Sequence, residues 1–303
     1  MRVFAGPEPR RRGTYAPVGF LLSFLAALIG FYLAQPRSEG EEGVTISLDD
    51  AQPVSTAKAR DLPKIYGTAG QDRPLVILDP GHGGHDPGAV SPHGGSQEKN
   101  VTLALAEAVR DTLAASGRVR VAMTREDDRF IVLRDRYEIA RRMKADLFIS
   151  IHADAAPSND DARGATIYTL SEVASDREAA LLAAQQNDSD RIGGAPLSKD
   201  EEVNRILIDL AQRESMNISA AFASLLKREA QRYFPFRPDY HRFASLIVLK
   251  APDIPSILLE TGYLTNAIDS AYIQSAQGRR QIALGVTNAV ETHFARRTRI
   301  ASR

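Results

Sequence analysis

Short apolar runs alternate with amphipathic helical segments between residues 74 and 170. Strands are predicted at PLVILD (74–79), VRVAMTR (119–125), DLFISI (146–151) and GATIYTL (164–170). Between them, apolar residues recur every four positions over 99–116, and Leu133, Tyr137 and Ala140 share the inner face of a helix over 132–145. Strands that alternate with helices pair in parallel through right-handed crossovers, so this part of the chain predicts an α/β sheet.

The pattern changes over residues 171–240, which contain no strand candidate and predict helices. Capping-box sequences begin at Ser175 and Ser198, and the second opens a helix over 199–214. The apolar stripe of that helix consists of Val203, Ile206, Leu207 and Leu210. Two more strands at 244–250 and 256–260 and a long helix near 279–296 complete the pattern. The predicted fold class is therefore α/β, a mostly parallel twisted sheet flanked by helices, with a helical insertion over 171–240.

The N-terminal region predicts export. A basic segment, 1–16, precedes the uncharged apolar run 17–34, which is typical of a signal peptide or a signal anchor. Cleavage after Ala34 would place Tyr32 where a small residue is required, so the sequence favours an uncleaved anchor in the inner membrane. Residues 35–73 are polar and predict a linker, 74–297 form the folded domain, and 298–303 form a basic tail. We expect everything after the apolar run to lie in the periplasm.

Composition narrows the classes of partner and site. Lys+Arg and Asp+Glu both number 38, so no net charge points to a nucleic-acid partner. Cysteine is absent, which rules out a disulfide framework and a thiolate metal site. Metal chemistry in this chain therefore depends on histidine and carboxylate ligands.

Four polar side chains occupy corresponding places in the predicted sheet. His82 and His152 follow two strands, Glu260 ends a third, and Glu98 lies where a loop enters the first helix. Because the carboxyl ends of parallel strands share one edge, these side chains can converge there. Two imidazoles and one carboxylate make a catalytic zinc set, and a second, unligated carboxylate can transfer protons.

The loop around His82 is rich in glycine, as phosphate-binding loops are. Its sequence is LDPGHGGHDPG (78–88), and it lacks the Gly-Lys-Ser/Thr ending of a phosphate loop. Glycines on both sides of His82 let the backbone turn sharply and bring the imidazole close to a metal. The sequence therefore predicts a metal loop.

Four separated motifs carry a family resemblance. LDPGHGGHDPGA, QEKN, DLFISIHAD and IPSILLETGYLTN occur in the expected order over residues 75–294. Together they resemble the zinc-dependent N-acetylmuramoyl-L-alanine amidases of the family-3 type, in the cell-division branch. The resemblance implies that His82, Glu98 and His152 bind Zn²⁺ and that Glu260 is the catalytic carboxylate. It also implies cleavage of the amide between N-acetylmuramic acid and L-alanine in peptidoglycan, in cell-wall remodelling and daughter-cell separation.

The insertion 171–240 resembles the regulatory insertion of those cell-division amidases, which lies over the active site. We expect it to inhibit the enzyme until a periplasmic protein activator displaces it. Acidic residues of the insertion that could occupy the open zinc position are Asp188, Asp190, Glu201 and Glu202, and the capping box already engages Glu201. Relatives in this branch often carry an N-terminal targeting domain, and the linker 35–73 is too short and polar to be one.

Other polar residues are assigned roles outside the site. His85 and His93 are interpreted as solvated loop residues, and His241 and His293 as structural. Arg134 and Arg136 either support the site or cover a helix face, and the sequence favours the helix face. The basic tail is interpreted as solvated, with contact to anionic cell-wall polymers as the alternative.

Two alternative functions stay open on the residues alone. A wall-binding protein that has lost turnover would keep this fold, although none of the four site residues is missing here. A zinc peptidase that cuts a peptide–peptide bond would use the same residues, and only the family resemblance separates it from an amidase.

Overall fold

The structure is a computed structural model, and it describes residues 62–68, 70, 72–156, 161–192 and 205–301. The predicted signal segment, most of the linker and the start of the helix expected at 199–214 lie outside these residues. In the part of the chain that is described, no helix is long and apolar enough to cross a membrane. The elements are β1 (Leu75–Pro80), α2 (Glu98–Ser116), β2 (Arg120–Met123), α3 (Leu133–Arg142), β3 (Leu147–Asp154), β4 (Ala165–Leu170), α4 (Arg177–Asn187), α5 (Ser189–Ile192), α6 (Arg205–Ala230), β5 (Phe236–Ala244), the 3-10 turn η1 (Ile247–Leu249), β6 (Ser256–Tyr263), α7 (Ala267–Gln274) and α8 (Ala276–Ala301).

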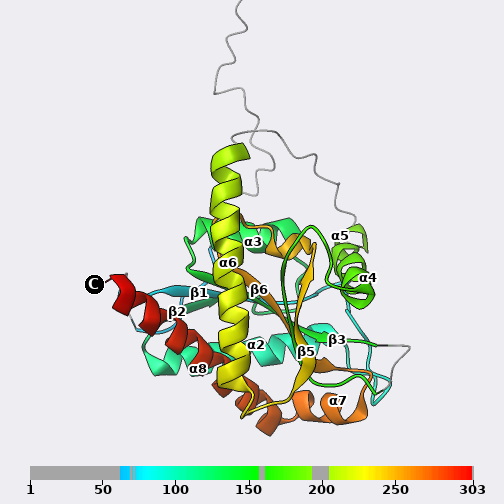
Figure 1. Cartoon of the computed structure of the whole chain (residues 1–303). Helices are drawn as coiled ribbons and strands as arrows, with labels where there is room; N and C mark the ends of the chain where they lie inside the picture. Colours follow the sequence, from blue (N-terminus) through cyan, green and yellow to red (C-terminus); the bar gives the residue numbers. More distant parts are fainter. Residues whose placement is uncertain (1–61, 69, 71, 157–160, 193–204, 302–303) are drawn as a thin grey trace, which may run out of the picture. The chain divides into compact units, whose positions relative to one another are not determined.

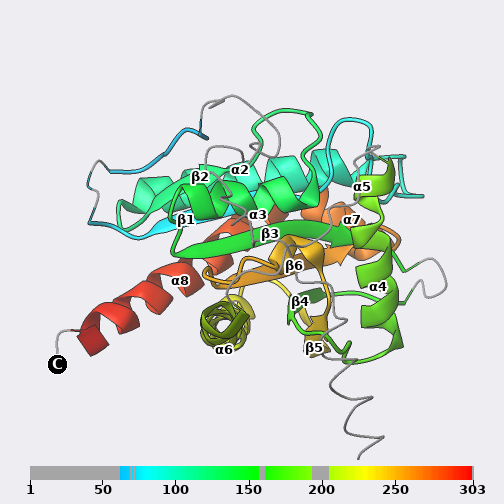
Figure 2. The same ribbon diagram turned by 90° about the horizontal axis from the view of Figure 1, so that it is seen from above.

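The strands form one sheet in the order β2-β1-β3-β6-β4-β5, which the labels of Figure 2 follow and Figure 1 shows from another side. Pairs β1–β2, β1–β3, β3–β6 and β4–β5 are parallel, as the alternation of strands and helices predicted. The pair β4–β6 is antiparallel. The expectation of a mostly parallel sheet is confirmed. Strands β4 and β5 are parallel to each other and run antiparallel to the other four strands.

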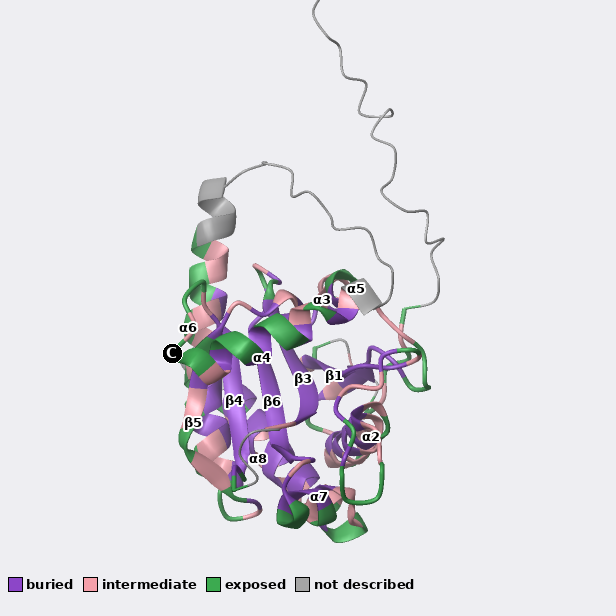
Figure 3. Ribbon diagram, turned by 90° about the vertical axis from the view of Figure 1, so that its right-hand side faces the viewer, coloured by how far each residue is buried: buried purple, intermediate pink, exposed green. Residues whose placement is uncertain are grey.

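Helices cover both faces of the sheet (Figures 1 and 2). Residues of α2, α6, α7 and α8 pack with Ile149, Ile151 and Leu259 on one face. Residues of α3, α4 and η1 pack with Phe148, Tyr168 and Leu258 on the other. Successive strand residues point to opposite faces, which explains why one strand supplies both cores. Figure 3 shows the buried strands between helices whose outer surfaces are exposed.

The strongly periodic helices form where the sequence predicted them. In α2, the side chains of Val101, Leu105, Val109 and Leu113 are all buried, and the helix ends at Gly117 in the left-handed conformation (φ 63°). In α3, Leu133 and Ala140 are buried, and Tyr137 is half-buried against the same core.

The prediction that 171–240 is wholly helical was wrong at its end. Strand β5 begins at Phe236, and the segment 244–250, predicted as a strand, contains the 3-10 turn η1 instead. Helix α4 is capped by Asp176, whose carboxylate accepts a hydrogen bond from the Ala179 amide, and not by the predicted Ser175. Strand β5 is an edge strand in which Arg237, Asp239 and Arg242 stand among aromatic residues, so its sequence lacks an apolar run.

Helix α6 is part of the domain core over its C-terminal half. Phe222, Leu226 and Ala230 are completely buried against the same face as α2 and α8. At the other end of α6, Leu210 is 65% exposed. The predicted docking of the apolar stripe is therefore wrong at Leu210, and the predicted insertion includes a helix that the folded domain requires.

Candidate metal centre

Three of the four predicted side chains meet at the carboxyl edge of β1 and β3. His82 lies in the loop after β1, Glu98 begins α2, and His152 lies within β3. One ligand atom from each lies within 4.8 Å of the others, and all three residues are buried. The donor set of two imidazoles and one carboxylate suits a zinc ion with positions left for water and substrate.

Hydrogen bonds from the loop fix the orientation of the ligands. The Glu98 carboxylate accepts hydrogen bonds from the backbone amides of Ala89 (2.8 Å) and Ala153 (3.0 Å). The Nδ1 atom of His82 is 2.8 Å from the carboxylate of Asp86. Its Nε2 atom is buried and lies 3.1 Å from the Glu98 carboxylate, without the geometry of a hydrogen bond. An imidazole that is held through one nitrogen, with the other facing a second ligand, is arranged as a metal ligand.

The loop backbone is shaped so that the ligands can approach one another. His82 itself has φ 62°, in the left-handed region that non-glycine residues rarely adopt. A Cβ atom on Gly81 would lie 2.2 Å from the His152 ring, and one on Gly88 would lie 2.6 Å from the Glu98 carboxylate. The glycines therefore permit close packing around the ligands, as well as the turn that the sequence predicted.

The three ligands perturb one another's pKa values. Burial disfavours the charged form of His82, but the Glu98 carboxylate and the hydrogen bond to Asp86 outweigh it and raise the pKa of His82 to about 9. Burial likewise opposes ionisation of Glu98, but His82 and His152 lower the pKa of this carboxyl below its ordinary value. Burial lowers the pKa of His152. Glu98 is therefore held ionised, and its negative charge favours a cation between the three ligands.

Glu260 lies beside the three ligands on the neighbouring strand. It pairs in register with His152 across β3 and β6, so the two side chains point to the same face of the sheet. Its carboxyl group is completely buried, and neither oxygen has a hydrogen-bond partner among the described residues. Burial and the nearby carboxylates of Asp154 and Glu98 raise the pKa of Glu260 well above its ordinary value. A carboxyl group with a raised pKa is suited to take up and release a proton.

A buried ion pair, Arg136 with Asp79, holds the backbone of the metal loop in place. Arg136 donates hydrogen bonds to the carbonyl oxygens of His82 (2.8 Å) and Pro80 (2.9 Å) and to the carboxylate of Asp79 (3.1 Å). Asp79 also accepts hydrogen bonds from Thr124 (2.6 Å) and Ser150 (2.8 Å).

The favoured interpretation of Arg136, as covering a helix face, was therefore wrong, since the residue is 1% exposed. The structure agrees with the alternative, that Arg136 supports the site, because it binds the His82 carbonyl oxygen. Its position between Leu133 and Ala140 on the inner face of α3 was the signal that could have revealed it. Arg125, which sequence reasoning missed, is also fully buried and donates to the carbonyl oxygens of Pro80 and Gly81.

The remaining histidines lie apart from this centre. His85 and His93 are exposed, and the metal-binding group found among the described residues contains neither. His241 belongs to β5, and its Nε2 atom lies 3.0 Å from the Thr169 hydroxyl. His293 packs its ring against Phe222 at 5.3 Å between centroids.

The acidic residues of the insertion lie partly within the described structure. Asp190, in α5, accepts a hydrogen bond from the backbone amide of Leu133 at 2.8 Å, at the start of α3. Asp188 follows α4 as its C-cap residue. Glu201 and Glu202 lie outside the described residues.

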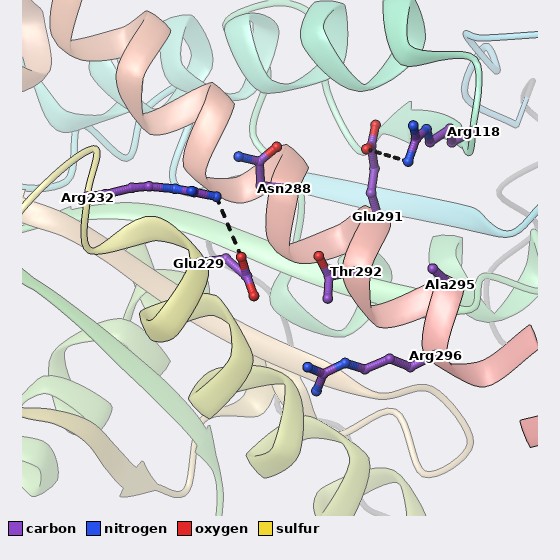
Figure 4. A pocket seen from close by; sticks show the side chains of 8 residues that line it. All are labelled: Arg118, Glu229, Arg232, Asn288, Glu291, Thr292, Ala295 and Arg296. Carbon is purple, nitrogen blue, oxygen red and sulfur yellow. Dashed lines mark ion pairs between the residues drawn. The ribbon is translucent and has the colours of Figure 1, made fainter. Parts of the chain in front are cut away.

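A hollow between α6 and α8 lies away from the predicted site residues, none of which lines it (Figure 4). Arg118 pairs there with Glu291 at 3.3 Å, and Arg232 pairs with Glu229 at 3.6 Å. Arg296 also lines the hollow, and no histidine does, so the hollow offers no arrangement comparable to the His-Glu-His group.

The fold and the site together define an α/β protein with a candidate metal centre at the carboxyl edge of its sheet. The sequence profile of the N-acetylmuramoyl-L-alanine amidase family matches residues 76–292. The chain belongs to this family.

Individual relatives agree with that assignment. AmiC of Neisseria meningitidis is 40% identical over 223 residues, which cover 73% of this chain and 53% of that protein. AmiA of Salmonella typhimurium is 35% identical over 254 residues, which cover 83% of this chain and 86% of that protein. The chain thus spans about half the length of the Neisseria AmiC.

Solved structures share the fold. AmiC2 of Nostoc punctiforme superimposes with a TM-score of 0.53 at 26% identity, over 75% of this chain and 99% of that one. An N-acetylmuramoyl-L-alanine amidase from Clostridium difficile gives a TM-score of 0.55 at 22% identity, over 74% of this chain and 97% of that one.

Proposed function

We propose that this chain is a zinc hydrolase that cleaves the amide between N-acetylmuramic acid and L-alanine in peptidoglycan. The observation that carries the proposal is the meeting of His82, Glu98 and His152 at one sheet edge, with Glu260 in register beside them. Family membership supplies the substrate class, because the Neisseria and Salmonella relatives are named N-acetylmuramoyl-L-alanine amidases.

Zn²⁺ is the ion that the donor set supports best. The buried His82 Nε2 atom without a hydrogen bond and the glycines that clear space around His152 and Glu98 fit a resident metal. When bound, zinc lowers the pKa of water and polarises a carbonyl group. In this assignment His82, Glu98 and His152 hold the ion, Asp86 orients His82, and the Ala89 and Ala153 amides orient Glu98.

Glu260 is the proposed catalytic residue. Its carboxylate accepts a proton from the attacking water and delivers it to the nitrogen of the leaving L-alanine as the amide bond breaks. Complete burial and the neighbouring Asp154 and Glu98 raise its pKa, which favours uptake of the proton by this carboxylate.

Cell-wall remodelling and daughter-cell separation are the proposed biological roles, and the periplasm is the proposed location. The basic segment and apolar run before residue 35 support export, with the inner membrane as a partner if the segment stays uncleaved. A reporter fused after Arg303 should be active only outside the cytoplasm, and activity confined to the cytoplasm would contradict export.

The insertion is proposed to restrain the enzyme until a periplasmic protein activator displaces it. Asp190 in α5 supports this, because it binds the first residue of α3 and α3 carries the Arg136 that holds the metal loop. Val173, Leu181 and Leu210 are large apolar side chains exposed on this part of the chain, at 77%, 60% and 65%. Exposed apolar side chains of this kind support contact with a protein partner.

A pair of substitutions in α6 tests the restraint. An activator shifts a closed–open equilibrium only through its higher affinity for the open state, so weakening the closed state must raise activity without it. Leu207→Lys should therefore speed digestion of sacculi, whereas Leu210→Lys, at an exposed position, should leave the rate unchanged. The restraint is refuted by a folded, zinc-bound Leu207→Lys protein that is no faster than the parent.

Product analysis on purified sacculi tests the reaction itself. An amidase releases free stem peptides with an L-alanine amino terminus and leaves intact glycan strands. A peptidase would leave the lactyl–alanine bond uncut and release shorter peptides. A wall-binding protein without turnover would release nothing, even when loaded with zinc.

A further inference from the structure

Glu178 belongs to the first turn of α4, and its carboxylate contacts a cluster of hydrogen-bond donors on the sheet. Its Oε1 atom is 2.7 Å from Arg237 Nη1 and 3.2 Å from the Tyr263 hydroxyl. Its Oε2 atom is 3.0 Å from Arg242 Nη1. Arg237 and Arg242 come from β5 and Tyr263 from β6. Two guanidinium groups and one hydroxyl thus converge on a single carboxylate.

The cations of this cluster lie beneath Glu178. The side chains of Arg237 and Arg242 are 15% and 5% exposed, whereas that of Glu178 is 44% exposed. The Nη1 atom of Arg242 is buried and makes no hydrogen bond among the described residues, although it lies against Glu178. Asp239 pairs with the Nε atoms of both arginines, at 3.1 Å each, so Asp239 and Glu178 together neutralise them. Glu178 covers the Nη1 side of the two guanidinium groups, and this is the side that becomes available when its half-exposed side chain rotates into solvent.

The cluster lies on the same face of the sheet as the candidate metal centre. Glu260 pairs with Thr166 across β6 and β4, and Tyr168, two residues further on, pairs with Arg242 across β4 and β5. Residues two apart in a strand point to the same face, so Arg242 and Glu260 share it. Strand β5 is two positions from β6 in the sheet, a distance of about 10 Å at the usual strand spacing. Three residues of extended peptide also span about 10 Å.

We propose that Arg237, Arg242 and Tyr263 form a subsite for a carboxylate of the substrate's stem peptide. Glu178 occupies this subsite until the substrate carboxylate replaces it. Guanidinium groups bind carboxylates through paired hydrogen bonds, and the Tyr263 hydroxyl ties the subsite to the strand that bears Glu260. The spacing selects a carboxylate two or three residues beyond the amide that is cut. This inference rests on the proposed amidase function and names the specificity residues of the same site.

A purely structural role makes different predictions. If the cluster only fastens α4 to the sheet, losing Glu178 would weaken the fold and would not improve binding of any substrate. It would also affect substrates with and without peptide carboxylates equally.

Two synthetic substrates separate the possibilities. Both carry N-acetylmuramic acid joined to a tripeptide, one with free carboxylates and one with every carboxylate amidated. Arg237→Gln should raise KM for the free-carboxylate substrate about 10-fold, the factor that corresponds to about 1.4 kcal/mol, with kcat nearly unchanged. Its KM for the amidated substrate should stay at the parent value. Glu178→Gln should lower KM for the free-carboxylate substrate alone, because it removes the internal competitor.

The control is Arg228→Gln, which removes an arginine of α6 that pairs with Glu229 at 2.7 Å. It should change neither KM. The subsite is overturned if Arg237→Gln affects both substrates equally or neither, or if Glu178→Gln raises KM for the free-carboxylate substrate.

Calorimetric binding of the free-carboxylate tripeptide alone gives a readout that does not depend on turnover. The parent should bind it more tightly than Arg237→Gln does, and equal binding would overturn the subsite. A protein that shows this difference yet cleaves neither substrate, even when Leu207→Lys weakens the restraint, would refute the amidase function and leave the subsite standing.

Discussion

Replacing Arg136 with methionine should destabilise the domain and loosen the metal loop together. Arg136→Met keeps most of the buried apolar stem and removes the guanidinium that binds Asp79 and the carbonyl oxygens of Pro80 and His82. Asp79 is completely buried, so its carboxylate would remain in the core without a cation. Breaking one side of a buried ion pair costs about 3–5 kcal/mol.

The hydroxyl groups of Thr124 and Ser150 still donate to Asp79 in this variant, which places the expected loss near the lower end of that range, about 3 kcal/mol. Urea unfolding measures the loss, and the zinc-to-protein ratio after dialysis measures the effect on the loop. The double substitution Asp79→Asn with Arg136→Met removes the uncompensated charge, so its loss should be smaller than the sum of the two single losses.

Arg134→Met is the matched control, because Arg134 is an exposed residue of the same helix. It should change the free energy of unfolding by less than about 0.5 kcal/mol, as surface substitutions usually do. An Arg136→Met protein as stable as this control, with a full complement of zinc, would refute the role assigned to Arg136.

Three further substitutions test the site and its surroundings. His152→Ala should lose most bound zinc while the sheet still folds, whereas the exposed His93→Ala should retain it; stoichiometric zinc in His152→Ala would disprove the ligand assignment. Gly81→Ala should also lower zinc affinity, since its Cβ would lie 2.2 Å from the His152 ring, and unchanged affinity would mean that the loop can shift. Burial, with Arg297 and Arg296 nearby, lowers the pKa of His293 to about 4. The unfolded chain, with a pKa near 6.5, therefore binds more protons between these values, and stability should fall by at most about 3 kcal/mol as pH drops from about 6.5 to about 4. His293→Leu should flatten this part of the pH profile, and an unchanged slope would show that other groups cause it.

Local sequence patterns predicted the parts of the fold that depend on local periodicity. The buried stripe of α2 and the apolar strands β1 and β3 follow directly from residue spacing. Strand β5 could not be found this way, because its pattern mixes Arg237, Asp239 and Arg242 with aromatic residues. Those charges are accommodated by Glu178 and Tyr263 from other elements, and contacts so distant along the chain leave no local signal. The antiparallel pairing of β4 with β6 is likewise decided by tertiary packing.

The convergence of the two candidate histidines could be predicted because His82 follows β1 and His152 lies near the carboxyl end of the parallel strand β3. His82 and His152 required only that β1 and β3 be neighbours, which they are. The buried arginines that support the metal loop were harder to predict, because only a position on an apolar helix face indicates that a charged residue is buried. Arg136 lies on such a face of α3, and the sequence still favoured a role in covering the helix face over one in supporting the site. Burial of a charge depends on its partner, and Asp79 lies 57 residues away in the sequence.

The rate of amide hydrolysis by zinc-loaded Glu260→Gln tests the central claim most directly. The substitution preserves the shape of the buried side chain and leaves His82, Glu98 and His152 unaltered, so zinc should remain bound at the parent ratio. Loss of a general acid–base group slows a reaction by about 10²–10⁴-fold, and we expect a loss of that size on sacculi. Near-parental turnover with zinc in place would show that another group carries the proton and would contradict the assignment of Glu260.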